Sequence, residues 1–336
     1  MKLKLSLFLL LVTLLACAAR GQDETIYMAV LSALGPPYSA DGSPRFGLFV
    51  STDRGSSWQH RGWEDYIRTF YAEEGGDGVI WAACGNGVLR STDAGASWRV
   101  TTGWEVTEVL KVKTAEIDPR VVFAATAYGI IRSTDGGDSW EKVSLGMRPA
   151  FSADVCIDRH NWRHVLAATE VGVYRTEDGG VRWVESGLTG KGIRVLVQDP
   201  LDERRFWAGT EDDGVFVSED RGQHWARRSE GLTDLTVYSI AVHSREENHL
   251  YAGTFGGGVF VSTDGGLRWE QSVRGLTDLQ VHALVVSSSD PELLLAGTLN
   301  DGLFRSTDGG ATWEYLTQEN SEVWGLSLRS ARGTDD

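Results

Sequence analysis

Seven copies of one eight-residue motif constrain the fold of this chain more than any other feature of its sequence. Each copy reads Ser/Thr-x-Asp-x-Gly-x-x-Trp, and none departs from it at the four defining positions. The seven aspartates are Asp53, Asp93, Asp135, Asp178, Asp220, Asp264 and Asp308, at spacings of 40, 42, 43, 42, 44 and 44 residues. A repeat period in this range is typical of β-propellers and solenoids.

Local patterning favours the propeller, because each period contains four short runs of β-type residues. In the sixth period these runs are Val237 to His243, His249 to Thr254, Gly258 to Ser262 and Arg268 to Ser272. They are rich in Val, Phe, Tyr and Trp, and Gly, Asp and Asn separate them. Four antiparallel strands per repeat make one propeller blade.

The two ends of the chain predict how the ring closes. The first repeat has counterparts of the second, third and fourth strands, at Ile26 to Val30, Gly47 to Ser51 and Trp58 to Gly62, but no innermost strand. The tail Glu322 to Arg329 reads as an innermost strand without a blade of its own. We therefore predict an all-β, seven-bladed propeller with four antiparallel strands per blade, in which the C-terminal strand completes the first blade.

Residues 1–21 read as a secretory signal rather than as part of the fold. Lys2 and Lys4 precede an apolar run from Leu5 to Ala16, which is shorter than a membrane span of about 20 residues. Cys17 fits a lipoprotein signal in which it becomes the lipidated first residue, while cleavage after Gly21 is the alternative. Either way we expect an exported protein, secreted, periplasmic or lipid-anchored, with residues 22–336 as its single domain.

Composition excludes several classes of partner. With 32 basic and 47 acidic residues the formal charge is -15, which argues against nucleic acid and anionic membrane surfaces. Cys84 and Cys156 lie in apolar runs and are expected to pack as small hydrophobic residues. The repeated aspartates lack the close ligand series of a calcium loop, so we expect them to be structural and expect no metal. We also expect no cofactor and a monomer.

The motif resembles that of the Asp-box (BNR) repeat superfamily over residues 26 to 329. This superfamily includes sialidases, xyloglucanase-type glycoside hydrolases, sortilin ectodomains and photosystem II assembly-factor propellers. The resemblance implies the fold, because the Asp-box builds a turn and not a site. No segment resembles the opening motif of sialidases, and the chain has residues for one ring where the xyloglucanases have two. In size and single-ring form the chain is most similar to the assembly-factor type.

Candidate binding residues follow from counting along the repeats. Stepping back fifteen residues from the Gly or Ala that precedes the last residue of each second strand reaches the start of the inner strand. These positions are Arg68, Leu110, Ala153, Arg194, Tyr238 and His282, with Trp324 as the counterpart in the closing strand. Neighbouring loops contribute Trp63, Glu64, Asp65, Tyr66, Tyr128, Glu170 and Asp213. The loop Ala33 to Arg45 is the one large insertion and is expected to face the ligand.

Aromatic rings beside charged groups are typical of sites for a sugar, a peptide or a carboxylate, although exposed polar residues are also the norm in loops. We therefore predict an exported, non-enzymatic binding or assembly platform for a protein or glycan, with its ligand at the channel mouth. The alternative is a glycoside hydrolase that uses a pair of mouth carboxylates, such as Glu170 and Asp213.

Overall fold

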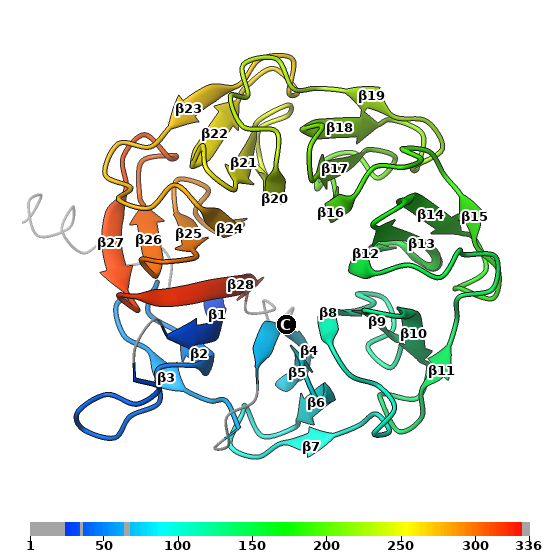
Figure 1. Ribbon diagram of the computed structural model, residues 1–336, viewed down its shortest axis with the longest axis horizontal. Helices are drawn as coiled ribbons and strands as arrows, with labels where there is room; N and C mark the ends of the chain where they lie inside the picture. Colours follow the sequence, from blue (N-terminus) through cyan, green and yellow to red (C-terminus); the bar gives the residue numbers. More distant parts are fainter. Residues whose placement is uncertain (1–23, 34–35, 64–67, 331–336) are drawn as a thin grey trace, which may run out of the picture.

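The computed structural model describes residues 24–33, 36–63 and 68–330, and the predicted signal with Cys17 lies outside them. Seven four-stranded sheets stand around one central axis, as predicted (Figure 1). The described residues form strands and turns, and none of their segments is a helix of the length and apolarity that crossing a membrane requires.

Within each blade the strands run from the axis to the rim in sequence order, except in the first blade. Blade 1 contains β28 (Ser321–Ser330), β1 (Glu24–Ala33), β2 (Gly47–Ser51) and β3 (Gln59–His60). Blade 2 contains β4 (Thr69–Gly76), β5 (Val79–Cys84), β6 (Gly87–Ser91) and β7 (Arg99–Val100). Blade 3 contains β8 (Val109–Thr114), β9 (Val122–Thr126), β10 (Gly129–Ser133) and β11 (Glu141–Lys142).

The remaining blades follow the same plan. Blade 4 contains β12 (Ser152–Asp158), β13 (Asn161–Thr169), β14 (Gly172–Thr176) and β15 (Val184–Glu185). Blade 5 contains β16 (Ile193–Gln198), β17 (Phe206–Thr210), β18 (Val215–Ser218) and β19 (Ala226–Arg227). Blade 6 contains β20 (Val237–Val242), β21 (Leu250–Thr254), β22 (Val259–Ser262) and β23 (Glu270–Ser272). Blade 7 contains β24 (Val281–Val286), β25 (Leu294–Thr298), β26 (Leu303–Ser306) and β27 (Glu314–Thr317).

The ring closes by pairing its two ends. β28 is antiparallel to β1, with Met28 opposite Leu326 and Ala29 opposite Gly325, and it forms the inner strand of blade 1. Figure 1 shows β28, in red, beside β1, in blue. The closing strand predicted from the sequence is therefore confirmed, and β1 gains the inner partner that the first repeat lacks.

The core lies between neighbouring sheets. One cluster joins blades 5 and 6, where Trp207, Phe260 and Trp269 are buried together. Close approach of the blades near the axis explains the small residues that end the second strands. A Cβ added to Gly209 would lie 2.9 Å from the backbone oxygen of Val237 in the next blade.

The Asp-box closes the turn between the third and fourth strands of every blade. In blade 5 the buried hydroxyl of Ser218 accepts a hydrogen bond from the Gly222 amide at 2.8 Å and donates one to the Asp220 carboxylate at 2.9 Å. The same carboxylate oxygen accepts the amide of His224 at 2.9 Å. The other six copies repeat the hydroxyl-to-amide bond at 2.8 to 3.0 Å. These contacts are those of a turn cap.

The Asp-box tryptophan ties its blade to the preceding one. The indole nitrogen of Trp225 donates to the carbonyl oxygen of Ser186 at 2.9 Å, and that of Trp269 donates to Arg228 in the same way. Trp58 in blade 1 differs, because its indole donates to Gly55 in its own turn. The tryptophans therefore add directional bonds to the packing between blades.

Two sequence features receive a simple structural account. Cys84 and Cys156 are free thiols, and burial raises the pKa of each to about 12.

The described part of the long loop after β1, residues 36–45, forms a small hairpin through a Tyr38 to Pro44 bridge. Figure 1 shows this loop, in blue, at the outer edge of blade 1 and away from the axis, so the expectation that it faces a ligand at the mouth is wrong for these residues.

Candidate functional site

A ring of seven side chains surrounds one end of the central channel. At the start of each inner strand a single residue is skipped in the antiparallel pairing. Ile193 pairs with Thr210 and Val195 pairs with Gly209, which leaves Arg194 between them. A register shift of this kind is a β-bulge, and bulges redirect side chains. The skipped residues are Phe70, Leu110, Ala153, Arg194, Tyr238, His282 and Trp324, and we call them the mouth ring.

Six members of the mouth ring are those predicted by counting, and blade 2 is the exception. There Thr69 pairs with Cys84 and Tyr71 with Ala83, so the skipped residue is Phe70 and not Arg68. The hairpin of β4 and β5 is two residues shorter than its counterparts, and a count of fifteen therefore overshoots. Arg68 is exposed just before β4, where its carbonyl oxygen accepts the Gly85 amide at 3.0 Å.

The mouth ring is aromatic over half of its circumference. Trp324 and His282 have ring centroids 3.9 Å apart, and His282 and Tyr238 are 4.7 Å apart. Phe70 meets Trp324 edge-on at 6.2 Å, and the Arg194 guanidinium lies 5.6 Å from the Tyr238 ring. Five consecutive blades thus present one continuous aromatic and cationic surface, which we call the aromatic arc. Leu110 and Ala153 complete the circle from blades 3 and 4.

The hydrogen bonding of His282 fixes its tautomer. Its Nδ1 lies 2.8 Å from the carbonyl oxygen of Trp324, which only accepts, so Nδ1 carries the proton. The Nε2 lone pair is left as an acceptor. Burial lowers the pKa of His282 to about 4, and the nearby positive charges of Lys111 and Arg194 act in the same direction. At neutral pH this residue is therefore an uncharged aromatic member of the arc.

The mouth ring and the residues behind it line a channel cavity of about 480 Å³, within the range of small-ligand sites. Charged side chains line it as well as apolar ones, among them Glu73, Lys111, Lys113 and Asp154. Sequence reasoning missed these four. The available signal was the pair of lysines in β8, whose sequence VLKVKT departs from the apolar inner strands of blades 6 and 7.

The predicted loop residues lie around the mouth but do not line the channel. Trp63 is half-buried and packs against the core between blades 1 and 2. Tyr128 is 63% exposed in the turn after β9. Glu170 accepts the Phe151 amide at 3.1 Å, and Asp213 pairs with Lys191. Glu64, Asp65 and Tyr66 lie outside the described residues.

Mouth carboxylates are engaged by neighbours. The Asp213 carboxylate lies 2.7 Å from the Lys191 ammonium, and the Glu211 carboxylate lies 2.5 Å from the Arg194 guanidinium. These contacts hold the loops of blade 5 against each other. They also orient Arg194 at the edge of the aromatic arc.

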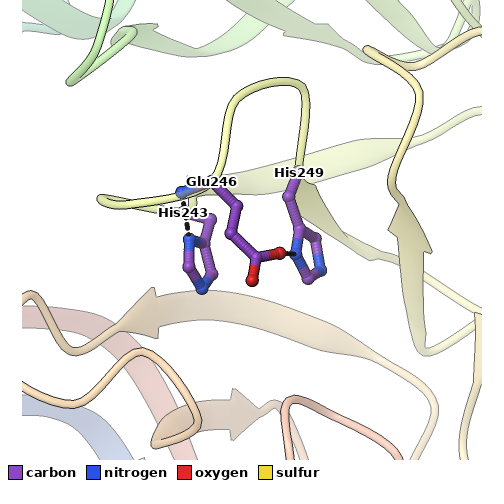
Figure 2. Close-up of side chains that lie close together, drawn as sticks. All are labelled: His243, Glu246 and His249. Atoms are coloured by element: carbon purple, nitrogen blue, oxygen red, sulfur yellow. Dashed lines mark hydrogen bonds and ion pairs between the residues drawn. The ribbon is translucent and has the colours of Figure 1, made fainter.

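One cluster of metal-ligand residue types gathers on the opposite face, in the loop between β20 and β21. His243, Glu246 and His249 bring one ligand atom each to within 4.8 Å of the others (Figure 2). The Nδ1 of His243, however, accepts the Glu246 amide at 2.8 Å and the Arg245 amide at 3.2 Å. An Nδ1 that accepts leaves the proton on Nε2, so neither nitrogen offers a free lone pair to a metal.

The equivalent residues in neighbouring blades explain the role of His243. The residue at the end of the inner strand, or directly after it, caps the same loop in blades 4 to 7. Asp158 accepts the His160 amide, Asp199 accepts the Leu201 amide and Ser287 accepts the Asp290 amide. His243 is the equivalent residue of blade 6, and we interpret it as a turn cap.

These features define an Asp-box seven-bladed propeller with an aromatic mouth. Scans found no matching family model and no curated protein of similar sequence. Among solved structures the chain is similar to YCF48 from Cyanidioschyzon merolae, with TM-score 0.62 and 16% identity over 80% of this chain and 90% of that one. It is also similar to YCF48 bound to D1 peptide, with TM-score 0.60 and 16% identity over 93% and 97% of the two chains.

A larger enzyme shares the fold. The GH74 xyloglucanase from Xanthomonas campestris gives TM-score 0.59 and 20% identity over 70% of this chain. This chain spans 43% of the length of that enzyme. At these identities the likeness shows a shared propeller fold.

Proposed function

We propose that this chain is an exported, non-enzymatic binding protein whose mouth ring holds a segment of a partner protein. The observation that carries the proposal is the aromatic arc. Phe70, Trp324, His282, Tyr238 and Arg194 lie in contact across five blades, and no packing requirement of the repeat calls for aromatic residues at these skipped positions. Aromatic residues and arginine are the side chains that contribute most to protein interfaces.

Exposed aromatic residues on the same face extend this surface beyond the channel. Trp104 is 92% exposed in the loop between β7 and β8, and Tyr128 is 63% exposed. Phe255 is 45% exposed and contacts the Tyr238 ring at 5.8 Å, which joins it to the arc. A surface of this breadth suits a polypeptide better than a single small molecule. The YCF48 propeller solved with a D1 peptide has a similar fold and supports the same class of ligand.

A peptide array tests the proposal. The purified protein is applied to arrayed peptides of diverse sequence, and binding is compared with that of two variants. Trp324→Ala removes the largest ring of the arc and is expected to weaken binding to the selected peptides about tenfold or more, since such anchors contribute about 2 kcal/mol or more. Tyr315→Ala removes an exposed aromatic ring from the outer strand β27 and is the matched control.

A panel of chromogenic glycosides and polysaccharides is examined in parallel. The proposal expects no turnover. Hydrolysis that disappears in Glu170→Gln or Asp213→Asn would overturn it in favour of the glycosidase. Equal peptide binding by Trp324→Ala and the wild type would overturn it as well.

A further inference from the structure

Two lysines two residues apart on β8 have opposite surroundings. The ammonium of Lys113 lies 2.9 Å from the Glu73 carboxylate and also donates to the Tyr71 hydroxyl. Glu73 and Tyr71 belong to β4, which lies beside β8 in Figure 1. Both ammonium groups also lie over the Tyr71 ring, that of Lys111 at 3.9 Å from the centroid and that of Lys113 at 4.5 Å. Among the described residues, no carboxylate lies within 4.0 Å of the Lys111 nitrogen, and no acceptor forms a hydrogen bond with its ammonium.

Lys111 therefore has a charge that no ion pair or hydrogen bond of the described residues balances. Burial lowers the pKa of Lys111, because the ammonium loses water without gaining an adjacent anion. Burial acts on Lys113 too, but the Glu73 charge outweighs it and raises the pKa of Lys113. Lys111 is half-buried and lines the channel, and its nitrogen is not among the fully buried polar atoms that lack a partner. Its three donors are therefore open to a ligand in the channel.

The acidic group whose charge acts most strongly on Lys111 does not pair with it. Asp154 is buried on the neighbouring inner strand, and its two oxygens accept the amides of Val155 at 2.8 Å and Leu196 at 3.1 Å. Its charge therefore serves to join blades 4 and 5. Lys111 is drawn to it only at longer range.

Further groups turn toward the same part of the channel. Arg194 pairs with Glu211 through one terminal nitrogen, but its Nε is buried and has no partner among the described residues. His282 offers the lone pair of Nε2, because Nδ1 carries the proton. Both positive charges, Lys111 and Arg194, act on His282. These three residues come from blades 3, 5 and 7, on β8, β16 and β24, which are spaced around the axis in Figure 1.

We propose that the neck of the channel, defined by Lys111, Arg194 and His282, binds a carboxylate of the ligand, with Lys111 as its counter-ion and the aromatic arc against the apolar body that carries it. The inference rests on the proposed function in placing the ligand at the mouth, and it adds the chemical class of the group that enters. A carboxylate fits the charge of the neck better than a phosphate. Asp154 and Glu211 already equal Lys111 and Arg194 in number, and a phosphate brings nearly two negative charges instead of one.

Small probes test the neck without the unidentified ligand. Phenylacetate carries a carboxylate on an aromatic body, and phenylacetamide is its neutral counterpart of the same shape. Titration calorimetry of the purified protein is expected to show phenylacetate binding about tenfold or more tightly than phenylacetamide, because the charged hydrogen bond is lost in the amide. Equal affinity for the two, or no binding of phenylacetate at millimolar concentration, overturns the proposal.

Two lysine variants assign the effect to one residue. Lys111→Met keeps the length of the side chain and is expected to reduce phenylacetate affinity by about tenfold or more. Lys142→Met, on the exposed strand β11, is the matched control and should bind as the wild type does. Phenylacetate affinity unchanged in Lys111→Met contradicts the assignment.

Stability measurements separate binding from folding. Because Lys111 is half-buried without an ion pair, Lys111→Met should unfold at the same temperature as the wild type or at a higher one. If Lys111 instead served only to hold Tyr71 in place, the variant would unfold at a lower temperature and phenylacetate binding would not depend on the charge. That pair of results overturns the proposal.

The peptide array separates this inference from the proposed function and distinguishes the sources of the carboxylate. For peptides that bind, amidation of the C-terminus removes one source, and Asp→Asn with Glu→Gln removes the other. Loss of binding with either change supports the carboxylate site. Peptides that bind equally after both changes, yet require Trp324, leave the proposed function standing and overturn the inference. Phenylacetate binding that depends on Lys111, without any peptide binding, supports the inference and overturns the proposed function.

Discussion

At the scale of single residues, the Asp-box hydroxyl is a buried group that holds a turn amide in every blade. The Ser218 hydroxyl is buried and accepts the Gly222 amide, while it donates to the Asp220 carboxylate that caps the turn. A buried amide that loses its acceptor has no access to water. The Asp220 carboxylate adds to the turn by accepting two further amides at 2.9 and 3.0 Å.

Ser218→Ala is therefore expected to lower the free energy of unfolding by about 1–3 kcal/mol, because the Gly222 amide is left without a partner. Chemical denaturation measures this. Ser218→Thr should retain most of the stability, since Thr176 occupies the same position in blade 4 and accepts the Gly180 amide at 3.0 Å. Ser56→Ala, at an exposed turn position, is the control, with a change below about 0.5 kcal/mol. Equal effects of the two alanine variants would contradict this account of the turn.

At the scale of strands, closure depends on close contact between β28 and β4. A Cβ added to Gly325 would lie 2.4 Å from the carbonyl oxygen of Phe70 and 3.1 Å from the Cα of Tyr71. Both atoms belong to the backbone and cannot rotate away as a side chain can. The glycine therefore allows the C-terminal strand to approach blade 2 while it completes blade 1.

Gly325→Ala should lower the free energy of unfolding by about 1–3 kcal/mol, the usual cost of overpacking. Amide hydrogen exchange should show faster exchange in β1 and β28 than in β17, because the closing pair separates first. Gly85→Ala is the control, since its added Cβ would meet only the Cβ of Arg68 at 3.7 Å. Uniform destabilisation of all blades, with no preference for the closing strands, would contradict the closure argument.

The same scale shows what sequence can and cannot predict. The motif spacing and the unpaired tail sufficed for the seven blades and for the pairing of β28 with β1. Counting failed in blade 2 because hairpin length varies between repeats, which moved the mouth position from Arg68 to Phe70. The sequence could not predict that Lys113 forms an ion pair and that Lys111 forms none, because both outcomes depend on the positions of Tyr71 and Glu73 in another blade.

At the scale of the whole molecule, the repeat separates scaffold from site. Turn caps and tryptophan bonds recur around the ring, whereas the skipped positions of the inner strands vary freely from Ala153 to Trp324. Seven equivalent strands therefore present seven independent choices of side chain to one channel. The aromatic arc occupies one side of this ring, which gives a symmetrical scaffold an asymmetrical mouth.

Acid sensitivity is a property of the whole ring, because every blade contributes one Asp-box carboxylate. The Ser97 hydroxyl, together with the Ser97 amide, lowers the pKa of Asp93 to about 2. Burial opposes the shift at Asp220, but hydrogen bonds from His224 and Ser218 outweigh it and lower that pKa to about 2 as well. The pKa values of the other five Asp-box carboxyl groups are also lowered.

These shifts fix the sign of the pH dependence. An unfolded aspartate has a pKa of about 3.9, so between pH of about 4 and 2 the unfolded chain binds more protons than the folded one. The stabilisation is complete above this window and is lost as the pH falls through it. The contribution of these groups to stability should therefore stay level from pH of about 7 to about 5. The thermal midpoint of unfolding should fall steeply below pH of about 4. Asp93→Asn should make the acid limb less steep, because one of the lowered carboxyl pKa values is removed. Asp212→Asn, in an exposed loop, is the control and should leave the limb unchanged. A midpoint that does not fall below pH 4 would mean that the turn caps are equally stable with protonated aspartates, and that the Asp-box works through its hydroxyl and tryptophan alone.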